Sequence, residues 1–310
     1  MTTRAMRLPA TAARSRTRQA QRRRGNVSGL GFLTPFLVLY VLFLILPLVL
    51  DVVMSLFNTS LVLPGLGRFA GLGNYGELFG DSRFWQAMWH TIAFTLVSTP
   101  PLVLIPLFFA IVVNRIRRGQ WFFRLAFFLP YILPSAVIAL IWLWLYEPGY
   151  GLIDGFFSML GLGAPGWLSS PNLALYSIVI VTVWWTIGFN FVLYLAGLQD
   201  IPRDLYEAAS IDGASRSRQT WRITLPMLGR TTTLVVVLQI IASLKIFDQI
   251  YLITAGGPNY ATRSAIEYIY DTGFTSQRVG YASAASLVLF VVILVVSFVW
   301  LALIQRQERV

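Results

Sequence analysis

The amino-acid sequence predicts an all-α membrane protein with six transmembrane helices and both termini in the cytoplasm. Mean hydropathy is +0.68 and only 12% of the 310 residues are charged, which is typical of a chain that lies mostly in lipid. Six apolar stretches are each long enough to cross the roughly 30 Å hydrocarbon layer as a helix. Polar or Gly/Pro-rich segments separate these stretches.

Scarce residue types exclude several classes of chemistry. The chain has no cysteine, which excludes disulfides, thiol redox chemistry and cysteine metal sites. Its single histidine, His90, rules out multi-histidine metal sites and leaves little general-base chemistry. We therefore expect no catalytic residue and no metal site, and an intramembrane enzyme is a weak alternative.

Residues 1 to 28 form a Ser/Thr/Ala tail that is rich in arginine. Because this tail has little hydrophobic content, we expect it to be disordered. A twin-arginine export signal is an alternative reading, but no short apolar region with a small-residue cleavage site follows the arginines. A cytoplasmic tail that rests on anionic membrane lipid fits the composition better.

The transmembrane domain is expected to comprise residues 29–305, followed by a short cytoplasmic tail of residues 306–310. The six spans are expected at residues 30–57, 89–113, 122–146, 173–198, 228–251 and 283–303. Short helices are expected near Asn74–Phe79 and in the loop after the fifth span.

Prolines interrupt the first three spans. We expect Pro35 and Pro47 to kink the first span, and Pro100, Pro101 and Pro106 to break the second in its middle. The third span carries prolines at 130 and 134. It ends in Trp142, Trp144 and Tyr146, and such rings gather at membrane–water interfaces.

The distribution of positive charge gives the orientation. Three loops that would share one face hold only Arg68, Arg83, Arg263 and Arg278. Apart from Lys245, every other Lys and Arg lies in the N-terminal tail, the 114–124 turn, the segment 201–230 or the C-terminal tail. Lys and Arg accumulate on the cytoplasmic side, so both termini are expected there. The net charge of +11 is thus a topology signal, and no nucleic-acid partner is expected.

A polar segment, residues 201–226, separates the fourth and fifth spans. Pro202 fits the first turn of a helix, and Gly213 can take the left-handed conformation that ends one. Glu207, with Ala208 and Ala209, would lie on a helix whose small residues leave one face flat. Such a helix suits insertion into a groove of another protein. A plain helical linker between two spans is the alternative, and physical chemistry alone leaves both open.

The spacing in this segment is specific. Glu207-Ala208-Ala209, three residues, Gly213, nine residues, Ile223, one residue and Leu225-Pro226 resemble the EAA motif. This motif marks the permease subunits of binding-protein-dependent ABC importers. Residues 30 to 305 resemble in particular the carbohydrate-uptake, maltose-type branch. The likeness includes WWTIGFNFVLYLAGLQDIPRDLYEAA before the motif and IFDQIYLITAGGPNYAT after the fifth span.

The resemblance implies a type I ABC importer permease core that transports a sugar, with di- or oligosaccharides expected. It implies a heterodimer with a second permease subunit, a cytoplasmic ATPase dimer and an extracytoplasmic sugar-binding protein, in the cytoplasmic membrane of a bacterium. The EAA helix would couple ATP hydrolysis to alternating access. Its coupling residues would be Glu207, Ala208, Ala209, Gly213, Leu225 and Pro226.

The chain has no nucleotide site of its own. A phosphate-binding P-loop needs a lysine after glycines, and the only lysine, Lys245, follows Ser243-Leu244 in an apolar run. No cofactor is therefore expected in this chain, and ATP with Mg²⁺ would be bound by the partner ATPase.

Polar groups within spans are candidates for substrate binding. The candidates are Trp184, Asn190 and Tyr194 on the fourth span and Gln239, Ser243 and Asp248 on the fifth. Asn and Gln also join helices to one another, which is the alternative role. Lys245 and Asp248, one helical turn apart, form an ion pair in that alternative.

Two further functions stay open at this stage. The substrate of an EAA-type importer could instead be a polyol or glycerol phosphate. A secondary transporter working alone would need an intramembrane acidic relay, for which the spans offer mainly Asp51 and Asp248.

Overall fold

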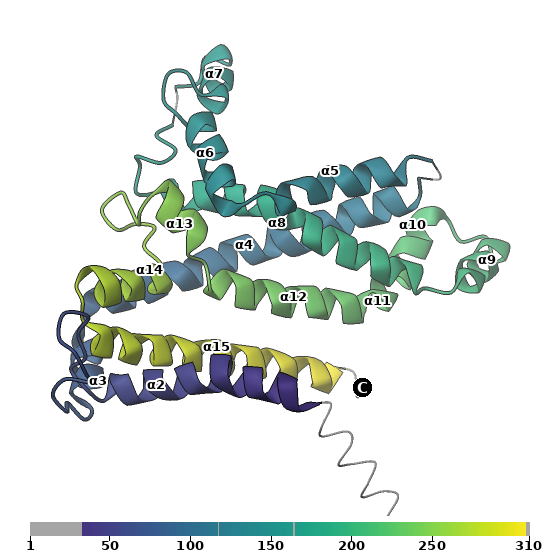
Figure 1. Ribbon diagram of the computed structural model, residues 1–310. Helices are drawn as coiled ribbons and strands as arrows, with labels where there is room; N and C mark the ends of the chain where they lie inside the picture. Colours follow the sequence, from purple (N-terminus) through teal and green to yellow (C-terminus); the bar gives the residue numbers. More distant parts are fainter. Residues whose placement is uncertain (1–32, 117, 164, 308–310) are drawn as a thin grey trace, which may run out of the picture. The chain divides into compact units, whose positions relative to one another are not determined.

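The computed structural model describes residues 33–116, 118–163 and 165–307. The predicted all-α class is confirmed, because these residues contain no β-strand and only one isolated bridge, between Phe57 and Phe69 (Figure 1). The chain divides into two compact units, residues 1–54 and 55–310. The expected basic tail, residues 1–28, lies outside the described residues.

The first unit ends in the helix Leu33–Ser55, which is long and apolar enough to cross a membrane. Within it, the π-helix η1 (Val41–Ile45) leads into α2 (Leu46–Ser55), and the N–H of Leu46 donates to the carbonyl of Val41. A proline ring crowds the carbonyl four residues before it. The wider π turn directly before Pro47 gives that ring room without ending the helix.

The second span is continuous, so the expected break in its middle is wrong. The short helix α3 (Gly73–Gly80), which was predicted, precedes α4 (Ser82–Asn114), a single helix of 33 residues with Pro100, Pro101 and Pro106 inside it. Asn190 from another helix donates a hydrogen bond to the carbonyl of Leu102. A neighbouring side chain thus satisfies a backbone group that a proline leaves free.

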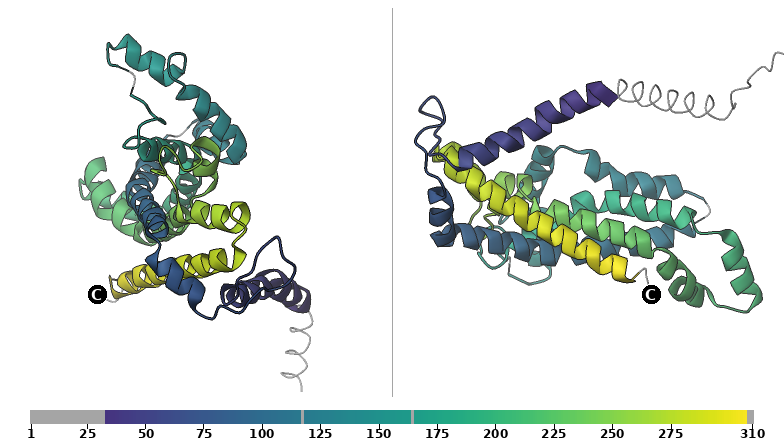
Figure 2. Two further views of the ribbon diagram at one scale, coloured as in Figure 1. Left: turned by 90° about the vertical axis from the view of Figure 1, so that its left-hand side faces the viewer. Right: turned by 90° about the horizontal axis from the view of Figure 1, so that it is seen from below.

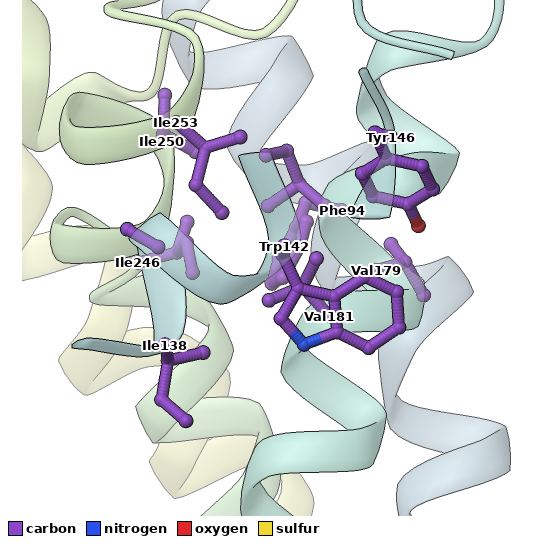
Figure 3. Close-up of a cluster of buried hydrophobic side chains, with 11 residues drawn as sticks. Phe94, Ile138, Trp142, Tyr146, Val179, Val181, Ile246, Ile250 and Ile253 are labelled. Atoms are coloured by element: carbon purple, nitrogen blue, oxygen red, sulfur yellow. The ribbon is translucent and has the colours of Figure 1, made fainter. Parts of the chain in front are cut away.

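The third span is broken. Helices α5 (Gln120–Ile132) and α6 (Ser135–Leu145) meet at 98°, with Leu133 extended before Pro134. A short helix, α7 (Leu152–Met159), follows in the loop. Trp142 on α6 is only 7% exposed, so its expected place at the membrane interface is wrong. Figure 3 shows the indole of Trp142 beside Val179 and Val181, and its ring centroid lies 5.6 Å from that of Trp184, so it packs inside a core cluster with α8.

The fourth span is α8 (Ala174–Gln199), at nearly the predicted bounds. The predicted coupling segment, residues 201–226, follows with α9 (Arg203–Ile211), α10 (Arg216–Gln219), the π-helix η2 (Thr220–Thr224) and α11 (Leu225–Met227). Figures 1 and 2 show α9 beyond the ends of α8 and α12.

The predicted fifth span is interrupted. Helix α12 (Gly229–Leu244) stops at Lys245, and α13 (Asp248–Ile253) begins after Phe247. The predicted short helix in the next loop is α14 (Ala265–Tyr270), which continues into the π-helix η3 (Asp271–Thr275). The last helix, α15 (Val279–Gln307), begins earlier than the predicted sixth span and runs beyond its end.

Within the described ranges, four helices can each cross a membrane. The number rises to six if two bent pairs are each one span, namely α5 with α6 and residues 216–227 with 229–244. In the second unit α4 packs against α8 and α12, and α5 packs against α8. A core cluster that includes Phe191, Tyr194 and Leu228 lies between these helices.

Candidate coupling and translocation sites

The coupling segment, residues 201–226, is a helical hairpin with a glycine at its bend. Helix α9 begins directly after Pro202 and its last turn leads to Gly213, whose φ is +73°. The N–H of Gly213 bonds the carbonyl of Ser210, and the N–H of Ala214 bonds that of Ala209. The left-handed residue expected at Gly213 is confirmed, and it lets the chain reverse toward α10.

Helix α9 presents its predicted coupling residues to the outside. None of its residues is buried, and the side chains of Glu207 and Ala208 are exposed. Ile211 is 87% exposed at the end of the helix. An apolar tip, two alanines and a carboxylate therefore lie on a free surface of this chain. Such a surface fits a groove of another protein.

Two hydrogen bonds hold the arms of the hairpin to each other, and a buried side chain anchors its start. The hydroxyl groups of Tyr206 and Thr224 are 2.9 Å apart, and the Gln219 amide donates to the Ser210 hydroxyl at 2.9 Å. Ile201 is buried at the start of the segment. Ile201 and Tyr206 pack with the core cluster between α4, α8 and α12.

A second candidate site is a cavity of about 440 Å³ among α4, α5, α8, α12 and α13. Its aromatic lining consists of Phe94, Tyr131, Trp185, Phe189 and Phe247. Its polar lining consists of Thr182, Thr186, Gln239, Ser243, Lys245, Asp248 and Gln249. Hydroxyl and amide groups beside aromatic faces can bind a polyhydroxylated molecule.

The interruption between α12 and α13 lies at this cavity. Lys245, Ile246 and Phe247 connect the two helices and line it. Irregular backbone at membrane depth occurs where it lines a cavity, and in transporters it marks binding sites. In the described part of the chain, Lys245 and Asp248 form no ion pair with each other. The break replaces the helical spacing that would have brought them together.

Three of the six predicted substrate residues lie at the cavity: Gln239, Ser243 and Asp248. Asn190 and Tyr194 are fully buried between helices instead. The amide of Asn190 donates to Leu102 and accepts from Gln239 at 3.0 Å, so both of its ends are used. Trp184 faces a separate apolar groove along α5 and α8.

Sequence reasoning missed the contribution of α8 to the cavity. Thr182, Trp185, Thr186 and Phe189 share one face at spacings of three and four residues. That periodicity was available in the sequence. It does not by itself tell a cavity face from a packed one, since all these side chains are common in buried helices.

The membrane-length helices, the exposed hairpin and the lined cavity fit a membrane-embedded transport permease. The chain belongs to the family of binding-protein-dependent transport system inner membrane components, whose family model matches residues 65–309. The sequence resemblance to ABC importer permeases is thereby confirmed.

Curated relatives align with this chain along most of their length. The chain is 34% identical over 276 residues to the sulfoquinovosyl glycerol transport system permease protein SmoG of Agrobacterium fabrum, covering 89% of this chain and 90% of the relative. It is 36% identical over 274 residues to the trehalose/maltose transport system permease protein MalF of Thermococcus litoralis, covering 88% and 92%.

A solved structure supports the fold. A chain of a bacterial ABC transporter involved in the import of the acidic polysaccharide alginate superposes with a TM-score of 0.81 at 23% identity. The match covers 93% of this chain and 99% of that one.

Proposed function

We propose that this protein is the permease subunit of an ATP-driven sugar importer in the cytoplasmic membrane of a bacterium. Each bent helix pair then counts as one crossing, which gives six spans with both termini in the cytoplasm. The charge distribution supports this orientation, since the coupling segment carries Arg203, Arg216, Arg218 and Arg222.

In this proposal α9 is the coupling helix and docks into a cleft of a separate ATPase. Glu207 pairs there with a basic residue, and Gly213 with Leu225-Pro226 maintains the shape of the hairpin. The observation that carries the proposal is that α9 bears the EAA motif, has no buried residue, and is tied by Tyr206 to Thr224 at the foot of α12. ATP and Mg²⁺ bind to the ATPase.

Two other partners complete the importer. A second, related permease subunit forms the other half of the pathway, and an extracytoplasmic binding protein delivers the solute. The family description itself names dependence on a binding protein. ATP binding to the ATPase dimer favours the outward-facing state, and hydrolysis returns the pathway to the inward-facing state, because ATP binds the two states with different affinity.

The cavity supports a sugar as the substrate. Five aromatic rings and a set of hydroxyl and amide groups face it, as recognition of a polyhydroxylated ring requires. Its two ionisable side chains, Lys245 and Asp248, carry opposite charges. The names of both curated relatives also contain a sugar. A polyol or glycerol phosphate is the alternative substrate, and Gln239, Ser243 and Asp248 would contact either.

The test is the ATPase activity of the reconstituted complex of this chain with its ATPase, second permease and binding protein. We expect ligand-loaded binding protein to stimulate hydrolysis in the wild type. Glu207→Ala and Gly213→Pro should each abolish the stimulation, whereas Asp200→Ala, which removes an exposed carboxylate just before the coupling segment, should retain it. Transport by this chain without any ATPase would show instead that it is a secondary transporter.

A further inference from the structure

Two adjoining hollows join α4 to the coupling segment, outside the translocation cavity. One is a polar pocket of about 350 Å³. Its lining is Ile111, Asn114, Arg115, Leu198, Tyr206, Arg216, Gln219, Thr220 and Thr224. The other is an apolar groove of about 390 Å³, which shares Ile111, Arg115 and Thr220 with the pocket. The two hollows therefore adjoin along these three residues, one polar and the other apolar.

The polar pocket is electropositive. Arg115 at the end of α4 and Arg216 at the start of α10 both line it, together with amide and hydroxyl groups. No Asp or Glu occurs among the lining residues, and in the described part of the chain neither arginine is paired with a carboxylate. Arg115 is held in place by a hydrogen bond to the hydroxyl of Thr220. Arginine and neutral donors around an open space suit a phosphate group.

The apolar groove follows one stripe of α4. Leu104, Leu107, Phe108, Ile111, Val112 and Arg115 recur at helical spacing along it. Leu104 and Phe108 are each more than 60% exposed, and Trp221, 71% exposed, lies on the opposite wall. From Leu104 to Arg115 the stripe is about 16 Å long, at 1.5 Å per residue. The length, openness and apolar lining of this groove suit the binding of a lipid acyl chain.

The level of the pocket matches that of lipid headgroups. Arg115 caps α4 immediately after a continuous apolar helix, so its guanidinium lies where the hydrocarbon layer ends. Trp221 carries an indole ring at the same end, as aromatic side chains do at membrane interfaces.

We infer that this hollow binds one anionic phospholipid, with the phosphate between Arg115 and Arg216 and an acyl chain in the groove along α4. Basic pockets between membrane helices on the cytoplasmic side bind such headgroups. The lipid would connect the end of α4 to the coupling segment through Arg216 and Thr220. It would thereby stiffen the hairpin that transmits the motion of the ATPase.

The experiment measures lipid retained by the detergent-purified permease complex in native mass spectrometry. The probes are phosphatidylglycerol and phosphatidylcholine with identical acyl chains. We expect the wild type to retain phosphatidylglycerol at least about tenfold better, since each basic residue near the headgroup contributes to binding an anionic lipid. The double variant Arg115→Gln/Arg216→Gln should lose this preference. The matched control Arg118→Gln/Arg124→Gln, which removes the same charge from the neighbouring turn, should keep it.

A second arm distinguishes a lipid from free phosphate. Val112→Trp fills the groove and should weaken retention of long-chain phosphatidylglycerol about tenfold while the arginines remain. Millimolar inorganic phosphate should not displace the lipid. If inorganic phosphate displaces the lipid, or if lipid retention does not depend on acyl-chain length, the pocket is an anion site without a lipid groove and the inference is overturned. Equal retention of phosphatidylglycerol by the two arginine double variants would also overturn the inference. So would a Val112→Trp variant that keeps its lipid and loses the second permease subunit.

Discussion

The side-chain amide of Asn190 donates a hydrogen bond of 2.7 Å to the carbonyl oxygen of Leu102, on a helix 88 residues earlier in the chain. In an uninterrupted α-helix that carbonyl would accept from the N–H of residue 106, which is a proline. Asn190 therefore replaces a donor that α4 lacks, and Gln239 in turn donates to Asn190. One buried chain of hydrogen bonds links α4, α8 and α12.

These linked hydrogen bonds predict that Asn190→Leu destabilises the protein. The substitution leaves the Leu102 carbonyl and the Gln239 amide without partners, so we expect a loss of about 1–3 kcal/mol of stability. Thermal unfolding of the purified permease measures it. In a Pro106→Ala background, which supplies the missing N–H, the same substitution should cost clearly less. If Asn190→Leu lowered stability equally in both backgrounds, Asn190 would not be compensating for the missing N–H of Pro106.

Gly188 is predicted to be intolerant of any side chain. A Cβ at this position would lie 2.1 Å from the carbonyl oxygen of Phe127, so α8 and α5 would have to separate. We expect Gly188→Ala to destabilise the protein by about 1–3 kcal/mol through overpacking. Gly76→Ala in α3 is the matched control, because no heavy atom lies within 4 Å there. That control should be neutral or stabilising by about 0.4–1 kcal/mol. Similar unfolding temperatures for the two variants would refute the close contact.

Glu267 predicts a pH dependence of stability. Its side chain is 2% exposed, and burial raises its pKa to about 7, as does the nearby Asp271, while Arg263 opposes the shift. The folded state thus holds a proton that the unfolded state releases near pH 4.5. Stability should therefore be greatest below that pH and fall by up to about 3 kcal/mol as pH rises to about 7.

The variant Glu267→Gln tests this assignment. It keeps the shape and removes the charge, so its unfolding temperature should change less between about pH 5 and about pH 8 than that of the wild type. The difference between the two profiles isolates Glu267 from other titrating groups such as His90. Parallel profiles would mean that Glu267 is not the group responsible.

Asp81 at the start of α4 and Glu77 on the preceding α3 are expected to differ in their contribution to stability. Asp81 caps this helix through the N–H of Arg83 and accepts from the hydroxyls of Tyr268 at 2.6 Å and Tyr281 at 3.1 Å. Glu77 pairs with Arg278, and both side chains are about half exposed. Asp81→Ala should cost about 2 kcal/mol or more, since it removes the cap and the carboxylate that accepts from both hydroxyls, which are left with only each other as partners. Glu77→Ala should cost under about 1 kcal/mol. Chemical denaturation of the two variants measures both losses of stability. A larger loss for Glu77→Ala than for Asp81→Ala would contradict the prediction.

Sequence reasoning located the elements whose signals are local. The spans at α8 and α15 follow from apolar length, and the bend at Gly213 follows from the conformational freedom of glycine. The predicted coupling residues stand out in the sequence because a polar segment lies between two apolar ones. These features need no knowledge of the rest of the fold.

The sequence predictions were wrong where the local structure depends on a residue that is distant in the chain. Prolines end α5 at Leu133 yet leave α4 continuous, and the donor supplied by Asn190 is invisible to any local pattern. Trp142 resembles an interface residue in sequence, but its ring packs inside a core cluster against α8. The break at Lys245–Phe247 has no glycine or proline to announce it. For the same reason, three substrate candidates lie at the cavity and three lie elsewhere.

The π-helix η2 sets the length of the coupling segment. The N–H of Leu225 bonds the carbonyl of Thr220, five residues back, so this turn holds one residue more than an α-helical turn. A π turn accommodates its extra residue without rotating the helix beyond it, so deleting a single residue from 220–224 would restore ordinary α-helical winding and leave α10 and α11 in register. The coupling segment would become one residue shorter, with the residues on either side of the turn still facing as they do now.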